Sequence, residues 1–332
     1  MASNMSLEKG AKYNRTIMKE VHFLGFQTSK DVNIFVFIFL LMFYILTLGG
    51  NLLIIILVSY NKTLHTPMYF FLTQLSFSDI LLTTDISPNF LYILLYEGGT
   101  MNFTICIFQY YIFIVTECTE CLLLTIMSYD RYLAICNPLH YMSIMNKLLC
   151  MKLTMFSWLL SIGSMLISTI TIANLDFCGP NLINHFFCDV SPLLNLSCSD
   201  TFVVQLEMVL LSVPILFLPF LFIVISYIYV ILAILKIPSN TGKQKAFSTC
   251  SSHLTVVSIF YVTLIVIYDL PTSGQSLTIS KLMSLLYTVG TPLMNPIIYS
   301  LRNKDMKIAF SKIKKVLKTC SCDGSKRWTV TE

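Results

Sequence analysis

The sequence predicts an all-α fold, a seven-transmembrane helix bundle followed by a short amphipathic eighth helix at the inner membrane surface. Of its 332 residues, 55% are apolar or aromatic and 12% are charged, whereas about 25% of an ordinary soluble domain is charged. The apolar residues also gather into stretches of about 20 or more, the length that crosses roughly 30 Å of hydrocarbon. Helices are favoured because each backbone polar group in lipid needs a partner within its own segment or a closed barrel, and the alternating pattern of barrel strands is absent.

Seven apolar stretches follow one another along the chain. The second and third are the least uniform, because Asp79 and Asp85 interrupt the second, and Glu117 and Glu120 interrupt the third. The other five stretches contain few charges. We interpret all seven stretches as membrane-spanning helices. The predicted spans run approximately over residues 34–59, 67–95, 103–129, 153–173, 203–235, 250–268 and 282–300.

Seven crossings place the two termini on opposite sides of the membrane, and lysine and arginine indicate which side is cytoplasmic. The tail after residue 301 holds nine of these bases, while the second, fourth and sixth loops hold only Lys281, at a helix edge. The N-terminal tail argues the other way with five bases, although three acids partly balance them. The first, third and fifth loops and their borders hold Lys62, Arg131, Lys147, Lys152, Lys236, Lys243 and Lys245. The chain therefore divides into an extracellular N-terminal tail (1–32), a seven-transmembrane domain (33–301) and a cytoplasmic amphipathic helix and tail (302–332).

The tail and the outer loops contain Asn-X-Ser/Thr sequences, which are glycosylation acceptors on the extracellular side. We expect Asn14 and Asn4 in the N-terminal tail to be modified. Asn102 and Asn195 fall in predicted outer loops, and Asn61 would face the cytoplasm and stay unmodified. The N-terminal tail lacks a continuous apolar core, so no cleavable signal peptide is expected and the first span would act as the membrane signal.

Four of the eleven cysteines fall on the outer side, where an oxidising compartment permits disulfides. Their number leaves three pairings open. The other seven lie in spans or on the reducing side, where cysteine is ordinarily a small buried hydrophobic residue. Two of these, Cys320 and Cys322, follow a basic amphipathic stretch and are candidates for palmitoylation. The four outer cysteines are Cys106, Cys178, Cys188 and Cys198.

The basic stretch after the seventh span has helical periodicity. Its apolar residues share one face and its lysines the other, so we expect it to lie along the inner leaflet. The alternative is a solvated basic tail. The apolar face consists of Met306, Ala309, Phe310, Ile313 and Leu317.

Acids within the spans point to function, because a charge at the bilayer centre costs at least ~2.5 kcal/mol on the lenient insertion scale. Phe113, Glu117 and Glu120 share a face of the third span, and Asp79 lies midway along the second. If Asp79 and Glu120 meet, a cation or a proton must separate them. Three interpretations are open: a bound sodium ion, a protonated carboxyl, or the proton relay of a transporter. A transporter would more naturally show internal repeats, and we find none.

Several ordered motifs carry a resemblance to a known family over residues 20 to 312. Each is weak alone, but all occur in order and at the proper ends of the predicted spans. The chain resembles rhodopsin-like (class A) G-protein-coupled receptors and, among them, the odorant (olfactory) receptors. The motifs are GN at 50–51, PMYFFLTQLSFSD at 67–79, MSYDRYLAICNPLHY at 127–141, SY at 226–227, KAFSTCSSHL at 245–254 and PLMNPIIYSLRN at 292–303.

The resemblance implies a switch at the inner end of the third span. Asp130 would hold Arg131 at rest, and activation would free Arg131 for a G protein, since an Arg-carboxylate pair is strong yet can exchange partners. Without the resemblance, the favoured interpretation is that both charges merely extend to the membrane interface. Pro296 would kink the seventh span, where the bundle rearranges. The implied switch residues are Asp130, Arg131, Tyr132, Tyr227, Lys243, Lys245, Pro296 and Tyr299.

The resemblance also implies the disulfides and an ion site. It pairs Cys106 with Cys188 and Cys178 with Cys198. His185 and Cys188 alternatively have the spacing of a metal-ligand pair, which an oxidised Cys188 would exclude. The family's sodium site corresponds to Asp79, Glu120 and Asn295, and apart from this candidate sodium ion no cofactor is expected.

Glu117 is outside the usual motif. It would contact ligand, cap a backbone group or join the ion cluster, and these three alternatives stay open.

The resemblance further implies a ligand chamber in the outer half of the bundle. It would be small and mostly apolar with a few hydroxyl groups, which suits a neutral volatile molecule, although Glu117 would instead favour a basic odorant. Ordinary helix packing is the alternative for each residue. A retinal pigment requires a lysine within the seventh span to form a Schiff base, but the only lysine there, Lys281, stands at the outer rim of the span. A usual amine receptor has a carboxylate at the position where this chain has Phe113. Both classes of receptor are therefore disfavoured. The chamber residues are Phe113, Ile114, Glu117, Cys118, Leu211, Ile215, Tyr261, Leu264, Ile265, Tyr268, Leu285 and Thr288.

The expected function is therefore that of an odorant receptor in the plasma membrane. The family implies a volatile ligand, a population shift on binding, and coupling through the olfactory stimulatory heterotrimeric G protein to cyclic AMP. The partners would be the odorant, the G protein and membrane lipid, with no nucleic acid. An enzyme is not expected, because the nucleophile elbow, phosphate loop and H-E-x-x-H are absent from the sequence. The alternatives are a rhodopsin-like receptor for a lipid or peptide, and a proton-coupled membrane carrier.

Overall fold

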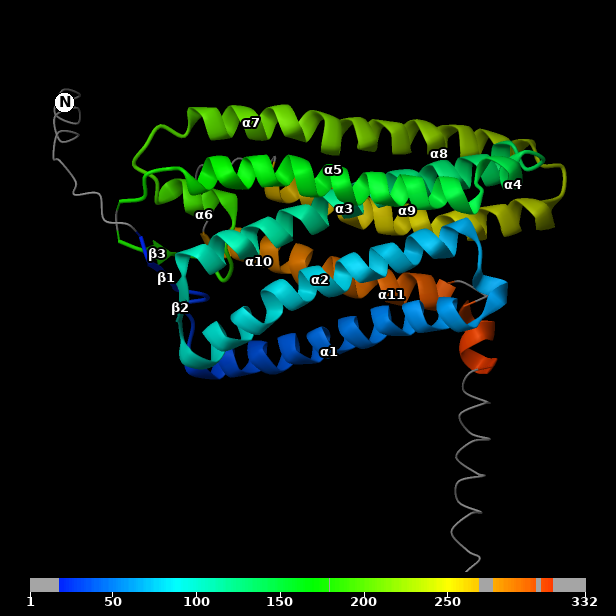
Figure 1. Cartoon of the computed structure of the whole chain (residues 1–332). Helices are drawn as coiled ribbons and strands as arrows, with labels where there is room; N and C mark the ends of the chain where they lie inside the picture. The colour runs from blue at the N-terminus through cyan, green and yellow to red at the C-terminus, as the bar shows by residue number, and fades with distance from the viewer. Residues whose placement is uncertain (1–17, 179, 269–276, 303–305, 313–332) are drawn as a thin grey trace, which may run out of the picture.

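Seven long helical segments run side by side along one axis (Figure 1). The structure is a computed structural model that describes residues 18–178, 180–268, 277–302 and 306–312. Each predicted span falls within one of these segments. They are α1 (Lys30–Tyr60), α2 (Pro67–Tyr96), α3 (Phe103–Cys136), α5 (Lys147–Ala173), α7 (Phe202–Ser212) with η2 (Val213–Phe217) and α8 (Leu218–Lys236), α9 (Asn240–Tyr268), and α10 (Leu277–Leu285) with η3 (Leu286–Gly290) and α11 (Thr291–Arg302).

The helices differ in how much of their apolar surface the protein buries. Within the described residues, α1, α3, α5 and the α7–α8 segment are long and apolar enough to cross a membrane by length and composition. The most apolar stretch of α3 is 61% buried, but those of α1 and α7–α8 are each 17% buried. Phe35, Ile38 and Ile45 on α1 are more than half exposed. Such an apolar exterior suits lipid rather than water. The much greater burial of α3 places this helix at the centre of the bundle.

Local signals fix several helix ends. The Asn102 side chain accepts from the backbone N–H of Thr104 (2.9 Å) at the start of α3, and Asn146 caps α5 in the same way. Pro67 occupies the first turn of α2, where its missing N–H has no consequence. At the other end of α2, Glu97 adopts a left-handed conformation with φ 56°. That conformation ends the helix and turns the chain into the next strand.

Two ends of the bundle carry different structures (Figure 1). One end, here called the disulfide end, has a three-stranded sheet of order β2-β1-β3. Strand β1 (Glu20–Phe23) pairs antiparallel with β2 (Gly99–Asn102) and parallel with β3 (Leu182–Ile183). The sequence patterns did not predict this sheet, which joins three segments far apart in the chain. Helix α6 (Val190–Asn195) lies in the long loop at the same end.

The opposite end, here called the arginine end, contains the Asp130–Arg131 pair. It also carries the short helices η1 (Lys62–Leu64) and α4 (Tyr141–Ile144). Residues 306–312 are helical and turn away from the bundle axis (Figure 1). Met306 and Ala309 of the predicted apolar face are buried against the bundle, and Phe310 is exposed. The placement of this helix on a membrane surface stays a prediction, and Ile313, Leu317, Cys320 and Cys322 lie outside the described residues.

Helices α9 and α5 extend beyond their predicted spans. Helix α9 begins at Asn240, ten residues before the apolar stretch that predicted it, and α5 begins at Lys147 rather than near residue 153. The apolar run marks only the part of a helix that lipid requires. Polar turns continue the same helix past it, so hydropathy underestimates the length of both.

Candidate functional site: arginine switch, ion site and ligand chamber

The structure brings Asp130 and Arg131 together as the switch hypothesis expects. Nε of Arg131 donates to Oδ2 of Asp130 at 2.9 Å, and Nη2 donates to the same oxygen. The other oxygen, Oδ1, accepts from the hydroxyl of Tyr141 in α4 at 2.7 Å. Asp130 is fully buried and Arg131 nearly so. Both carboxylate oxygens are therefore satisfied, which is the closed arrangement of the pair.

Tyr141 was not among the predicted switch residues. It closes the MSYDRYLAICNPLHY motif, so the sequence contained a signal for it, but its role depends on α4 folding back over α3. Burial and the neighbouring Asp130 raise the pKa of Tyr141. It therefore remains a neutral phenol whose hydroxyl donates a hydrogen bond to Asp130.

The predicted switch tyrosines have different partners. The Tyr227 hydroxyl lies 2.6 Å from Nδ1 of His253, with the two rings stacked, so it joins α8 to α9. His253 was missed, although it stands in the KAFSTCSSHL motif. The Tyr299 hydroxyl is buried and has no hydrogen-bond partner among the described residues. Tyr132 contacts the ring of Tyr229 edge to face at 6.2 Å.

The remaining switch residues lie on α9 and α11. Lys243 is half-buried in the first turns of α9, and the side chain of Lys245 lies outside the described part of the structure. Pro296 lies within α11 and cannot donate to the carbonyl of Pro292. Asn51 of α1 donates to that carbonyl oxygen at 3.2 Å. The GN motif of α1 therefore meets α11 at the point where Pro296 interrupts the backbone hydrogen bonds of that helix.

The three predicted ion-site residues come together in the middle of the bundle. Nδ2 of Asn295 lies 3.0 Å from each carboxylate oxygen of Asp79. Glu120 interacts electrostatically with Asp79, and its Oε1 has no hydrogen-bond partner within the described residues. All three are at least 98% buried. Clustered hard oxygen atoms with an unsatisfied lone pair fit either a sodium ion or a proton.

The predicted chamber residues divide into two groups. Phe113 contacts the rings of Phe187 (5.1 Å) and Tyr287 (6.1 Å) edge to face and belongs to the main core. The second group packs around Val115 and Met165, along the seam between α3, α5 and α7. Ordinary packing therefore accounts for the contacts of this second group. Its members are Ile114, Cys118, Leu211 and Ile215.

Tyr261 connects the chamber to α3. Its hydroxyl lies 3.1 Å from Sγ of Cys121, and its ring lies 4.8 Å from that of Phe220. Cys121 was missed by the sequence analysis. Its thiol also donates to the carbonyl of Ile215 at 3.0 Å. Tyr261, Cys121 and Ile215 thus form a continuous contact from α9 through α3 to η2.

The other chamber residues are described in part. Leu264 is buried and Leu285 is half-buried. The hydroxyl of Thr288 donates to the Ser284 carbonyl of its own helical segment at 2.8 Å. The side chains of Ile265 and Tyr268 lie outside the described part of the structure, as do Asn4 and Asn14.

A long loop between α5 and α7 covers the disulfide end. Cys106 of α3 forms a disulfide with Cys188 of this loop, and Cys178 forms one with Cys198, with Cα separations of 5.5 and 5.8 Å. Because Cys188 is oxidised, the His185–Cys188 pair lacks the thiolate that metal ligation requires, so that alternative interpretation is wrong.

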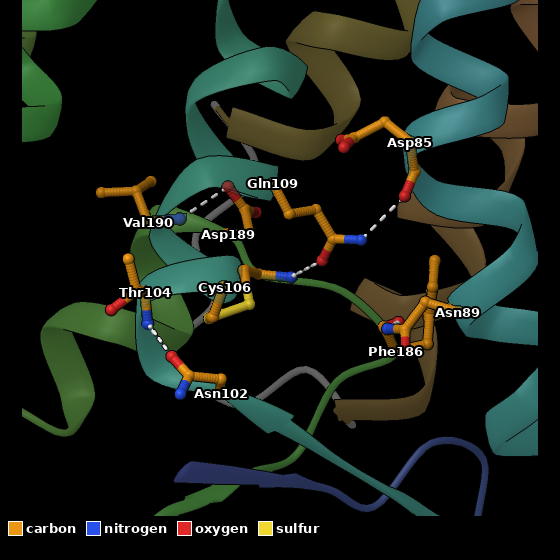
Figure 2. Close-up of a disulfide and its surroundings, with 10 residues drawn as sticks. Asp85, Asn89, Asn102, Thr104, Cys106, Gln109, Phe186, Asp189 and Val190 are labelled. Carbon is orange, nitrogen blue, oxygen red and sulfur yellow. Dashed lines mark hydrogen bonds between the residues drawn. A yellow bond between two sulfur atoms is a disulfide. The ribbon is translucent and has the colours of Figure 1, made fainter. Parts of the chain in front are cut away.

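Gln109 holds the covering loop to the bundle (Figure 2). Its Oε1 accepts from the backbone N–H of Cys188 at 3.0 Å, and its Nε2 donates to the carbonyl of Asp85 at 2.9 Å. Asn89 donates to the carbonyl of Phe186 at 3.4 Å. These bonds place Phe186 and the neighbouring Phe187 against α2 and α3. Gln109 stands one turn after Cys106, which is a signal that the sequence analysis did not use.

Two titratable groups of the covering loop, His185 and Asp189, have shifted pKa values. His185 stacks on Phe186 and lies beside Phe187, and burial together with Lys281 lowers its pKa to about 3. Burial raises the pKa of Asp189 to about 6, although the N–H of Val190 donates to it. Nζ of Lys281 donates to Asn184 of the loop (2.6 Å) and to the carbonyl of Gly25.

The fold and this arrangement define a class of protein. A seven-helix bundle with a buried Asp130–Arg131 pair at one end, a polar cluster at mid-depth and a disulfide-anchored loop at the other end has the architecture of rhodopsin-like receptors. The crystal structure of squid rhodopsin matches with a TM-score of 0.70 over 89% of this chain and 84% of that chain. At 18% identity, this likeness shows the fold alone.

Sequence comparison gives the family. The olfactory receptor family model matches residues 39–318. Human Olfactory receptor 11L1 is 43% identical over 300 residues, covering 90% of this chain and 93% of the relative. Human Olfactory receptor 5G3 is 46% identical over 299 residues, covering 90% and 95%. The rat Olfactory receptor 1468 is 44% identical over 301 residues, covering 90% and 96%. The chain belongs to the olfactory receptor family, whose members are multi-pass membrane signalling receptors and not enzymes.

Proposed function

We propose that this receptor binds a small volatile ligand among Phe113, Tyr261 and Tyr287 and, when occupied, activates a stimulatory heterotrimeric G protein that raises cyclic AMP. The disulfide end would face the extracellular side of the plasma membrane and the arginine end the cytoplasm. The closed Asp130–Arg131–Tyr141 contact carries this proposal. In this proposal it is the resting contact, and a rearrangement of the bundle on activation would open it.

The mechanism is a shift in population between two bundle arrangements. Ligand moves the equilibrium only by the difference between its affinities for the two states. Tyr261 is the residue that would respond to bound ligand, because the hydroxyl of Tyr261 contacts Cys121 and its ring contacts Phe220. Displacing that ring changes the packing of α9 against α3 and α8. Closer to the arginine end, Tyr227 and His253 join α8 to α9.

The ion site stands between the two ends. Asp79, Glu120 and Asn295 would hold a sodium ion in the resting bundle, since the carboxylates repel each other without one. A protonated Glu120 would meet the same requirement. The distinguishing feature is whether sodium concentration changes the resting activity.

Replacing Arg131 with alanine tests the switch. Arg131→Ala should abolish the cyclic AMP response to a volatile panel in cells that carry a cyclic AMP reporter. It should leave occupancy intact, measured as thermal stabilisation of the purified receptor by an active volatile. Lys152→Ala is the control, because Lys152 is an exposed base at the same end of the bundle.

Three outcomes would count against the proposal. Retained coupling in Arg131→Ala would remove the switch role. Cyclic AMP responses to lipids or peptides and to none of the volatiles would favour a different rhodopsin-like receptor. Ligand flux across vesicles that disappears in Asp79→Asn would favour a carrier.

A further inference from the structure

Glu117 of α3 is a buried acid that makes no side-chain hydrogen bond to any described residue. It is 8% exposed, and neither of its carboxylate oxygens has a hydrogen-bond partner among the described residues. Asp79 and Asp130 differ, and Glu120 has only one oxygen, Oε1, without a hydrogen-bond partner among the described residues. Asp79 accepts twice from Asn295, and Asp130 accepts from Arg131 and a tyrosine. An ionised carboxylate left buried and unpaired is strongly destabilising, so Glu117 is either protonated or paired with a cation that binds beside it.

The two buried lysine or arginine side chains among the described residues are bound elsewhere. Arg131 is held by Asp130 at the arginine end, and Lys281 donates to Asn184 and to the Gly25 carbonyl at the disulfide end. Neighbouring acids make the need for positive charge greater. Glu120 and Asp79 both interact electrostatically with Glu117. One sodium ion at the ion site would neutralise one charge of this group and leave the others.

Neighbouring contacts show which space Glu117 faces. Phe113 lies one turn before it and Cys121 one turn after it, on the same side of α3. Phe113 contacts the ring of Tyr287, and Cys121 contacts the hydroxyl of Tyr261. Glu117 therefore stands between the two levels at which α3 meets the aromatic residues of the proposed chamber.

The residues that meet α3 from α9 and η3 are aromatic at both levels. Phe260 connects the two contacts, with its ring 5.4 Å from that of Tyr261 and 6.4 Å from that of Tyr287. Aromatic faces attract cations and also pack against apolar groups. The combination of one unpaired acid with a series of aromatic rings favours a small apolar molecule that bears a positive charge.

We propose that the ligand of this receptor is a protonated amine whose ammonium group binds the carboxylate of Glu117 and whose apolar body packs among Phe113, Tyr261 and Tyr287. The inference rests on the proposed odorant function and specifies its ligand class. A charge-assisted N–H···O pair in this dry site gives both orientation and affinity. A neutral alcohol can donate a hydrogen bond to the carboxylate but leaves its charge uncompensated.

Matched compound pairs test the ligand class. The probes are 2-phenylethylamine with 2-phenylethanol, cyclohexylamine with cyclohexanol, and 3-methylbutylamine with 3-methylbutanol, which differ in charge but hardly in shape. We expect one or more amines to raise cyclic AMP in cells that express the full chain. We also expect the matched alcohol to need at least about 30-fold more compound, since removing one partner of a buried charge pair costs 2 kcal/mol or more and 1.4 kcal/mol is tenfold.

Substitutions test the residue. Glu117→Gln keeps the shape and removes the charge, so the half-maximal amine concentration should rise at least about 30-fold. Glu117→Asp retains the charge and should recover part of the potency. Glu207→Gln is the matched acid-to-amide change on α7. Oε1 of Glu207 also lacks a hydrogen-bond partner among the described residues. That control should shift amine potency by less than about threefold. Antibody labelling checks surface expression of each variant.

Each result decides the inference. Responses to alcohols or other neutral volatiles with none to amines overturn it and leave the odorant function standing, and so does unchanged amine potency in Glu117→Gln. If Glu117→Gln does not reach the surface, thermal unfolding of the purified wild-type receptor decides instead: greater stabilisation by an amine than by its alcohol supports the inference, and equal stabilisation overturns it. If no volatile of any kind raises cyclic AMP or stabilises the receptor, the proposed function fails together with the inference.

Discussion

At the scale of single residues, prolines leave two carbonyl oxygens without helical donors, and side chains from neighbouring helices replace the donors. Pro296 cannot donate to the carbonyl of Pro292, and Asn51 of α1 donates to it instead. Pro219 cannot donate to the carbonyl of Ile215, and the thiol of Cys121 on α3 donates to that oxygen. Each proline thus creates a polar joint between two helices, because a buried carbonyl requires a partner.

Asn51→Ala tests the joint at Pro292. The substitution should lower the free energy of unfolding by about 1 to 3 kcal/mol, because a buried carbonyl loses its donor. The measurement is thermal unfolding of the purified receptor in detergent. Asn174→Ala is the control, since Asn174 is exposed at the end of α5, and it should change stability by less than about 0.5 kcal/mol. Equal effects of the two changes would contradict the role of Asn51.

The sequence predicted the site residues whose chemistry is visible in isolation. Acids within apolar spans identify Asp79 and Glu120, and an adjacent acid and base identify Asp130 and Arg131. It missed residues whose role depends on which distant segments meet. Tyr141 reaches Asp130 only because α4 packs on α3, and the same holds for His253, Cys121 and Gln109 with their partners on other elements.

At the scale of elements, the loop between α5 and α7 is the covering structure of the disulfide end. Two disulfides, the Gln109 bridge, strand β3 and the Lys281 contacts hold it. Its interior contains His185 with a pKa lowered to about 3 and Asp189 with a pKa raised to about 6. Acidification therefore acts on these two groups in opposite directions.

The His185→Phe variant separates the two effects. A histidine pKa of about 3, below its ordinary 6.5, means that the neutral ring contributes stability above pH 6.5 and that this contribution is lost as the pH falls towards 3. The Asp189 pKa of about 6, above its ordinary 3.8, means that the contribution of its protonated form is present at low pH and is lost as the pH rises through 6. The variant keeps only the second effect, so its stability relative to the wild type should rise by about 2 kcal/mol between pH 7.5 and pH 5, at about 1.4 kcal/mol for each pH unit below 6.5.

Thermal unfolding of both purified receptors at pH 7.5, 6 and 5 measures this difference. Parallel curves would show that His185 is not held neutral by the loop. Lys281 lies near the ring and its charge favours the neutral form, so Lys281→Met should reduce the difference between the curves.

At the scale of the whole molecule, apolar exposure and a polar interior describe the same bundle. The outward faces of α1 and α7–α8 are apolar, and the interior around α3 contains Asp79, Glu117 and Glu120. Hydropathy predicted the spans because the apolar residues of a span are consecutive in the sequence, although among the described helices only α1, α3, α5 and the α7–α8 segment are by themselves long and apolar enough to cross a membrane. It did not predict the sheet of β1, β2 and β3, because four residues or fewer in each strand carry no periodic signal and their pairing is decided only when distant segments meet.

Charge distribution makes a prediction about the orientation of the whole chain. The loops and borders at the arginine end hold Lys62, Lys147 and Lys152 among seven bases, and the segment after residue 301 holds nine. The N-terminal tail opposes them with five bases. By the positive-inside rule, the larger group near the span ends should decide. An epitope at the N-terminus should then be labelled on intact cells, and one at the C-terminus only after permeabilisation.

Neutralising the opposing group makes the orientation test quantitative. Replacing Lys9, Lys12, Arg15, Lys19 and Lys30 with glutamine removes the charges that favour the reverse orientation. The labelled fraction of N-terminal epitope on intact cells should therefore stay the same or rise. A fall in that fraction, or a C-terminal epitope accessible on intact cells, would place Asp130 and Arg131 on the outside and contradict the proposed coupling to a G protein.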